Sequence, residues 1–110
     1  MDKCDIFISY SRKDIEVVRR IKVDIEKATG TKCWMDLEGI SYTSPDFVKI
    51  IAPAIENASV FVFILTPDSQ ISQWARNELL LAYDLEKSVF FVKPQECKMT
   101  SEFIYNVPIN

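Results

Sequence analysis

Short apolar runs alternate along this 110-residue chain with longer segments in which apolar residues recur at every third or fourth position. The runs are rich in strand-forming residues and predict β-strands over residues 5–9, 32–36, 59–66 and 88–93. The longer segments have the spacing of amphipathic helices and predict helices over residues 11–29, 44–55 and 72–87. Strands and helices therefore alternate, an order typical of a parallel sheet with right-handed crossovers.

Local signals mark the ends and weak points of the predicted helices. Ser11 is placed as an N-cap, with Asp14 three residues later, and Gly30 fits the left-handed residue that ends a helix. Pro53 lies inside the second helix and removes a backbone hydrogen bond. We therefore expect a kink or a break near residues 51–53.

The run over residues 59–66 is apolar on both strand faces, which predicts a central strand covered on both sides. Residues 66–69 are expected to form a loop. The C-terminal segment 95–110 is weakly patterned, and its clearest element is a short edge strand over 103–107. We expect one α/β domain over residues 1–110: a flavodoxin-like three-layer sandwich whose mostly parallel central sheet has four to five strands, with helices on both faces.

Ligand sites in such folds lie beyond the carboxyl ends of the strands, at the point where the strand order reverses. In this chain that edge would be formed by residues 9–12, 36–43 and 66–69 and by the start of the third helix. The search for functional side chains is thereby narrowed to these four segments.

The composition limits the chemistry that this edge can carry. There is no histidine, which excludes Ser-His-Asp triads and zinc sites that use histidine. The only glycines, Gly30 and Gly39, are too few for a GxGxxG or phosphate-binding loop. Cys4, Cys33 and Cys97 form no CxxC pair, so we expect neither a disulfide framework nor a metal site.

The charge and the distribution of apolar residues bear on partners and location. Thirteen Lys and Arg residues against sixteen Asp and Glu residues give a net charge of −3, which disfavours direct binding to nucleic acid. The N-terminus lacks a signal-peptide pattern, and the longest apolar stretch, residues 60–65, is far shorter than a membrane span. We expect a cytoplasmic domain without membrane contacts.

One residue of the third helix departs from its surroundings. Glu78 shares a helical stripe with apolar residues, at positions Trp74, Leu81, Ala82 and Leu85. A carboxylate directed at a core needs a partner or a function, because burial without one is costly. Glu78 either pairs with a basic side chain such as Arg12 or with a backbone amide, or it is a catalytic carboxylate. Trp74 is correspondingly either a core residue or a stacking platform.

Four segments together resemble a TIR (Toll/interleukin-1 receptor) domain, in particular the bacterial type. Residues 5–11 (Asp-Ile-Phe-Ile-Ser-Tyr-Ser) resemble the opening box of that family, and residues 36–40 the start of its BB loop. Residues 60–67 resemble the central strand with its following turn. Residues 74–78 (Trp-Ala-Arg-Asn-Glu) fit the Trp-x-x-x-Glu signature of the branch that cleaves NAD⁺.

The resemblance implies an NAD⁺ glycohydrolase that releases nicotinamide and leaves ADP-ribose or a cyclic isomer, with NAD⁺ as substrate and no cofactor. It implies activation by homotypic self-association, as in bacterial antiphage defence or immune signalling. Glu78 would be the catalytic residue, and the substrate would be bound by Tyr10, Ser11, Arg12, Asp36 and Trp74. A loop that gates the site or contacts a neighbouring chain would contain Leu37, Glu38, Gly39 and Ile40.

This chemistry is compatible with the composition, because nicotinamide departs as a neutral molecule and needs no acid to protonate it. One carboxylate that stabilises an oxocarbenium-like ribosyl centre could suffice. The alternative is a non-enzymatic TIR adaptor that acts only through TIR–TIR contacts. Because the chain is shorter than a typical TIR domain, we also expect a parent protein that continues into a sensor or oligomerisation domain.

Overall fold

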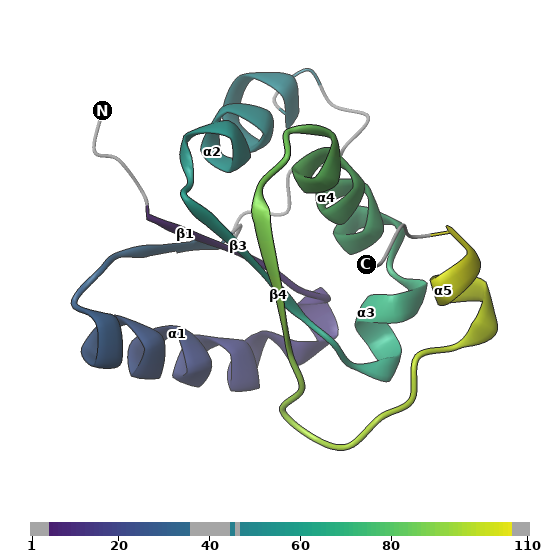
Figure 1. Cartoon of the computed structure of the whole chain (residues 1–110). Coiled ribbons are helices and arrows are strands. Elements are labelled where there is room, and N and C mark those ends of the chain that lie inside the picture. The colour runs from purple at the N-terminus through teal and green to yellow at the C-terminus, as the bar shows by residue number, and fades with distance from the viewer. Residues whose placement is uncertain (1–4, 36–44, 46, 107–110) are drawn as a thin grey trace.

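The computed structural model describes residues 5–35, 45 and 47–106 (Figure 1). Within these residues four parallel strands form one sheet in the order β2-β1-β3-β4. The strands are β1 (Ile6–Ser9), β2 (Cys33–Met35), β3 (Val60–Ile64) and β4 (Ser88–Val92). The predicted parallel α/β sheet is confirmed, with four strands in the described part of the chain.

The two central strands are β1 and β3, which pair in register from Ile6 opposite Val60 to Ser9 opposite Phe63. The prediction that the 59–66 run is a central strand is therefore confirmed. The chain builds outward from β1 to β2 on one side and from β3 to β4 on the other. The strand order thus reverses between β1 and β3, and the ligand site of such a sheet is expected where these two strands end.

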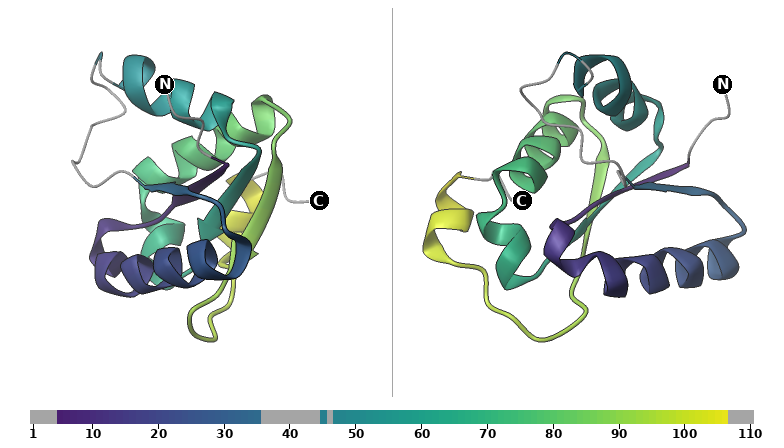
Figure 2. Two further views of the ribbon diagram at one scale, coloured as in Figure 1. Left: turned by 90° about the vertical axis from the view of Figure 1, so that its left-hand side faces the viewer. Right: turned by 180° about the vertical axis from the view of Figure 1, so that it is seen from behind.

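Helices cover both faces of the sheet, as predicted (Figures 1 and 2). One face is covered by α1 (Ile15–Thr29), whose fully buried Val18 packs with Ile8, Val62 and Ile64 of the strands. The other face is covered by α2 (Ala52–Asn57), α3 (Pro67–Ile71), α4 (Gln73–Asp84) and α5 (Ser101–Asn106). No helix in the described part of the chain is long and apolar enough to cross a membrane.

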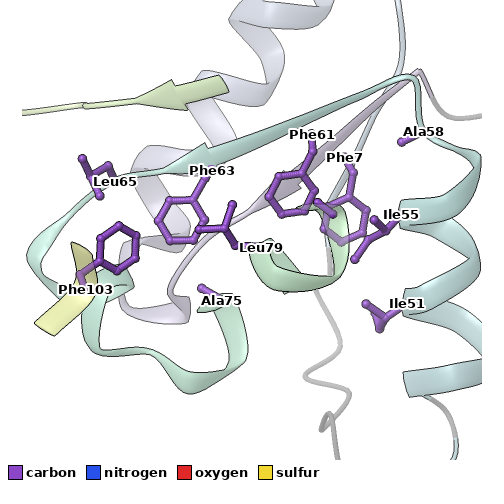
Figure 3. Close-up of a cluster of buried hydrophobic side chains, with 11 residues drawn as sticks. Phe7, Ile51, Ile55, Ala58, Phe61, Phe63, Leu65, Ala75, Leu79 and Phe103 are labelled. Atoms are coloured by element: carbon purple, nitrogen blue, oxygen red, sulfur yellow. The ribbon is translucent and has the colours of Figure 1, made fainter. Parts of the chain in front are cut away.

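The larger core lies between the sheet and the helices α2, α4 and α5, and its side chains are drawn in Figure 3. Phe7 and Phe61 of neighbouring strands stack with their ring centroids 5.5 Å apart, and Phe63 lies 5.7 Å from Phe103 of α5. Each of these rings is fully buried, which contributes roughly 1.5–3 kcal/mol of transfer free energy per side chain. Phe103 thereby joins α5 to the rings of the sheet, and α4 packs on the same core through Ala75, Leu79 and Ala82.

The two ends of the first predicted helix agree with the local sequence signals, except that the α-helix begins later than expected. Gly30 is left-handed (φ 70°) and its N–H donates to the Glu26 carbonyl, so the predicted C-cap is confirmed. Ser11 is an N-cap as predicted, but it caps a 3₁₀ turn, η1 (Arg12–Asp14), and the α-helix begins only at Ile15.

The second predicted helix is not broken, but it changes its type at the place where we expect a kink or a break. A π-helical segment, η2 (Phe47–Ile51), changes to the α-helix α2 at Ala52, so the irregularity falls at residues 51–53. Pro53 is the second residue of α2, so the hydrogen bond that a proline cannot donate falls at the change from π-helix to α-helix.

Two predictions about short segments are wrong. Residues 67–71 form α3, although the Thr-Pro-Asp-Ser sequence reads as a loop. Thr66 and Ser69 form a reciprocal capping box, in which each side-chain oxygen accepts the other's backbone N–H at 3.0 and 2.9 Å.

Residues 101–106 form the helix α5, and the edge strand predicted over 103–107 is not formed by the described residues. The hydroxyl of Thr100 accepts the N–H of Phe103 at 3.1 Å, which supports a helical turn here. The Phe103 ring enters the core while Ile104 and Tyr105 remain exposed. The packing of the Phe103 ring in the core is a tertiary contact that the local sequence does not show, and it favours the helix over the predicted strand.

Candidate active site

A cavity of about 330 Å³ lies where the sheet topology predicts a ligand site. Its walls come from the loop after β1, from α3 and from the start of α4. The lining residues are Tyr10, Ser11, Arg12, Lys13, Asp68, Ile71, Ser72 and Trp74. Four of the predicted substrate-binding residues, Tyr10, Ser11, Arg12 and Trp74, are thus brought together in one cavity.

The cavity has a cationic and aromatic side. The guanidinium of Arg12 lies over the indole of Trp74, 5.3 Å from the ring centroid, which is a cation–π distance. Lys13 follows Arg12 in the lining. Two cationic groups beside an aromatic face suit a ligand that carries both phosphate and a planar ring.

The first turn of α4 places Trp74 in this wall. Ser72 caps the helix, and its hydroxyl accepts the N–H of Ala75 at 3.1 Å. Trp74 is half-buried and lines the cavity, so its side chain lies at the edge of the buried helix face and not at its centre.

The buried face of α4 is shifted by one position from the predicted stripe. Its buried residues are Ala75, Glu78, Leu79 and Ala82, whereas Leu85 is 38% exposed. The prediction that Leu85 lies on the core face is therefore wrong, because α4 ends at Asp84. Glu78 lies in the middle of the buried face and is itself only 2% exposed.

The carboxylate of Glu78 is bound by Ser9, which belongs to the 9–12 segment expected at this edge but is not among the predicted site residues. The Ser9 hydroxyl donates to Glu78 Oε1 at 2.8 Å, and both residues are buried. Glu78 is not among the residues that line the cavity. It lies behind them, since Ser9 precedes Tyr10 in the chain and Glu78 follows Trp74 by one helical turn.

Ser9 could have been found from the strand pattern. It is the hydroxyl-bearing residue at the end of an otherwise apolar strand, two positions after Phe7, so both side chains lie on the same face of the sheet. That face is the one covered by α4. Lys13, Asp68, Ile71 and Ser72 are further lining residues that are not among the predicted site residues. Asp68 belongs to the 66–69 segment and Ser72 to the start of the third helix, both of which were expected at this edge.

A second hollow of about 270 Å³ adjoins the cavity, and Asp68 lines both. Its carboxylates are those of Asp14, Asp68 and Glu96. The Thr66 hydroxyl donates to Asp14 Oδ2 at 2.6 Å and fixes one of them. A phosphate group is repelled from this acidic hollow and favoured near Arg12 and Lys13, so the two hollows differ in the charge they accept.

The predicted Asp36 and the predicted loop residues Leu37, Glu38, Gly39 and Ile40 lie outside the described residues. Among the described residues no three His, Cys, Asp or Glu side chains are grouped so that they could hold a metal ion.

The sequence matches the profile of a known family, described as TIR domain, over residues 6–105. The chain belongs to the TIR domain family. No curated protein matches this TIR domain significantly. Several solved structures do match it significantly. The TIR domain of the Toll-related receptor TRR-2 from Hydra magnipapillata superimposes with a TM-score of 0.71 at 20% identity, over 90% of this chain and 77% of that one.

The TIR domains of the activated Roq1 resistosome, which directly recognises the pathogen effector XopQ, superimpose with a TM-score of 0.63 at 17% identity. The match covers 82% of this chain and 57% of the Roq1 chain. At these identities the likeness establishes the TIR fold, and the residues of the cavity must be interpreted from their own geometry.

Proposed function

We propose that this TIR domain is an NAD⁺ glycohydrolase that cleaves the nicotinamide–ribose bond, giving nicotinamide and ADP-ribose or a cyclic ADP-ribose isomer. The observation that carries the proposal is the carboxylate of Glu78, buried one helical turn from Trp74 behind a cavity with a cationic and aromatic wall. A buried glutamate in the middle of an apolar helix face is expensive, and a role in binding or catalysis accounts for its presence.

The reaction does not require a general acid from the protein. The bond between ribose C1′ and the pyridinium nitrogen breaks, and nicotinamide leaves as a neutral molecule with the bonding electron pair. Water then attacks C1′ and loses a proton, which gives ADP-ribose. Ordinary glycosidases need a protonated carboxyl group as well as a carboxylate, because their leaving group must be protonated. Here one carboxylate that stabilises the positive ribosyl centre is sufficient.

The cavity residues have matching roles in this proposal. Arg12 and Lys13 attract the diphosphate, Trp74 offers a face for the nicotinamide ring, and Glu78 accepts hydrogen bonds from the ribose hydroxyls. Because Glu78 does not line the cavity, the wall formed by Tyr10 and Trp74 must open before ribose reaches it. Homotypic self-association is the proposed trigger for this opening, and cytoplasmic antiphage defence or immune signalling within a longer parent protein is the proposed setting.

A second candidate function is a non-enzymatic TIR adaptor that acts through TIR–TIR contacts. One observation favours it: Glu78 is 2% exposed and accepts the Ser9 hydroxyl at 2.8 Å, as a purely structural carboxylate would. In that case the Ser9–Glu78 bond would serve only to hold α4 on the sheet.

Nicotinamide release separates the two functions. The chain is fused to an oligomeric scaffold to force clustering, and wild type is compared with Glu78→Gln and with Glu16→Gln, an exposed glutamate of α1 used as matched control. If the protein is an NAD⁺ glycohydrolase, wild type and Glu16→Gln should release nicotinamide and Glu78→Gln should release none. Equal release by all three proteins would overturn the role of Glu78, and no release by clustered wild type would favour the adaptor.

A further inference from the structure

We infer that Ser9 is a positioning residue for Glu78, an inference that rests on the proposed function. Its hydroxyl orients the carboxylate and favours the ionised form that the reaction requires. The Ser9–Glu78 bond joins residues 69 positions apart in the sequence, both of them buried. It therefore depends on the fold and not on local chain geometry.

The donor is held rigidly. Ser9 is the last residue of β1, is fully buried and pairs with Phe63 of β3 in the centre of the sheet. Its side chain lies on the same face as Phe7, against α4. A hydroxyl on a central strand moves less than one on a loop, so the oxygen that it binds is fixed to the sheet.

The hydroxyl has one proton and two oxygens within reach. Ser9 Oγ lies 2.8 Å from Glu78 Oε1 and 3.4 Å from the carbonyl oxygen of Ala75. The shorter distance and the charge of a carboxylate both assign the proton to Glu78, because bonds to ionised acceptors are stronger than bonds to neutral ones. A donor to the carboxylate stabilises its ionised form relative to its protonated form.

The same bond ties together the two elements that form the cavity. Immediately after Ser9, β1 leads into Tyr10, Ser11 and Arg12, and one turn before Glu78, α4 carries Trp74. A displacement of α4 along the sheet would move Trp74 away from Arg12 and Glu78 away from Ser9 together. Ser9 thus sets the position of Glu78 relative to the groups that would hold the substrate.

A purely structural bond and a positioning bond predict different kinetics. For the clustered protein, Ser9→Ala should lower kcat by roughly 10-fold to 100-fold, the range expected for loss of one charge-assisted hydrogen bond, with little change in KM. The acid limb of its pH–rate profile should move to higher pH, since the ionised carboxylate has lost a donor. Ser9→Thr keeps the hydroxyl and should restore most of kcat, and Ser9→Cys, a weaker donor of similar size, should be intermediate.

Val18→Ala is the matched control for lost stability, because Val18 is fully buried on the opposite face of the sheet. It should lower stability without moving the pH profile. A second readout does not depend on activity: the ¹³C signal of the Glu78 carboxyl, identified by its absence in Glu78→Gln, should titrate at higher pH in Ser9→Ala than in wild type.

These measurements distinguish a failure of the Ser9 inference from a failure of the proposed function. If wild type is active and Glu78→Gln is not, but Ser9→Ala keeps the wild-type kcat, pH profile and carboxyl titration, Ser9 has no positioning role and the proposed function stands. If clustered wild type releases no nicotinamide, the proposed function is overturned and the catalytic meaning of Ser9 with it. An unmoved pH profile in Ser9→Ala, together with a stability loss equal to that of Val18→Ala, would identify the bond as structural only.

Discussion

Arg12 lies over the ring of Trp74, with its guanidinium carbon 5.3 Å from the ring centroid, so that the turn after β1 and the first turn of α4 meet across the cavity. Arg12 and Trp74 are far apart in the sequence. They come into contact because β1 lies in the centre of the sheet and α4 packs over it. The pair combines a positive charge with an aromatic face at the one place where the topology predicts a ligand site.

Replacement of Arg12 by Gln should weaken substrate binding. A cation that contacts a diphosphate contributes a charge-assisted interaction, so KM for NAD⁺ should rise by about 10-fold or more while kcat changes little. Steady-state kinetics of the clustered protein give both constants. Arg19→Gln, which removes an exposed cation of α1, is the control and should leave KM unchanged. Equal KM values for wild type and Arg12→Gln would exclude Arg12 from the binding site.

Gln70 should prove important for the segment that precedes α5. Its side chain is 2% exposed, donates to the Lys98 carbonyl at 3.0 Å and accepts the Thr100 N–H at 2.7 Å. Gln70→Ala leaves these backbone groups without that partner and should destabilise the fold by about 1–3 kcal/mol. Urea denaturation measures the loss, and hydrogen exchange at the Thr100 amide should accelerate. Gln73→Ala, at an exposed position of α4, should change neither.

The sequence predicts a strand where α5 forms, and the hydrogen bonds of Gln70 are part of the reason. Residues 101–106 are only weakly patterned, and the helix is favoured by Gln70 from thirty positions upstream and by the core around Phe103. α3 was missed for a different reason, since Thr66-Pro67 is also a common loop start and only the reciprocal bond with Ser69 distinguishes the two. The contacts of α5 with Gln70 and with the core lie far apart in the sequence, so no local pattern reveals them. The Thr66–Ser69 capping pair is local, but its sequence is compatible with both a loop and a helix.

The sheet and the position of the cavity were predictable because they depend on patterns that are local. Apolar runs place the strands, and alternation with helices places the site at their carboxyl ends. The hydrogen bond from Ser9 to Glu78 was not predictable, because these two residues meet only when β1 and α4 pack together. Spacing on α4 identified the buried glutamate correctly but placed Leu85 wrongly on the core face.

Glu86 should be a site at which substitution stabilises the protein. It is left-handed (φ 57°) and forms the end of α4, where Glu86 N–H donates to the Tyr83 carbonyl and Lys87 N–H to the Ala82 carbonyl. A side chain with a Cβ is strained in this conformation, so Glu86→Gly should raise the free energy of unfolding by about 0.5–1 kcal/mol. Urea denaturation tests this. Glu86→Gln, which keeps the Cβ, should show no gain, and a loss in Glu86→Gly would contradict the strain.

Glu26 should make the stability of the fold depend on pH. The backbone N–H of Cys33, which donates to Glu26 at 2.9 Å, lowers the pKa of this carboxyl below its ordinary value of 4.5, and Lys22 at 3.2 Å lowers it further. Because the folded pKa is below the unfolded one, the stabilisation is complete above pH 4.5 and is lost as the pH falls through the folded pKa.

Glu26→Gln should therefore reduce stability at pH 7 and cost progressively less as the pH falls below 4.5. Urea denaturation of wild type and variant across this range gives the difference. Glu16→Gln, an exposed carboxylate in the first turn of the same helix, serves as the control. A stability difference between wild type and Glu26→Gln that is the same at pH 7 and at pH 3 would contradict the assignment.

The measurement that bears most directly on the account is the stoichiometric conversion of NAD⁺ by the clustered domain. Wild type should release one nicotinamide for each NAD⁺ consumed, and Glu78→Gln, purified in the same way, should be slower by at least about 100-fold, since it lacks the carboxylate that stabilises the ribosyl centre. NAD⁺ that is consumed equally by both proteins, or by neither, would contradict the central claim that Glu78 is a catalytic residue.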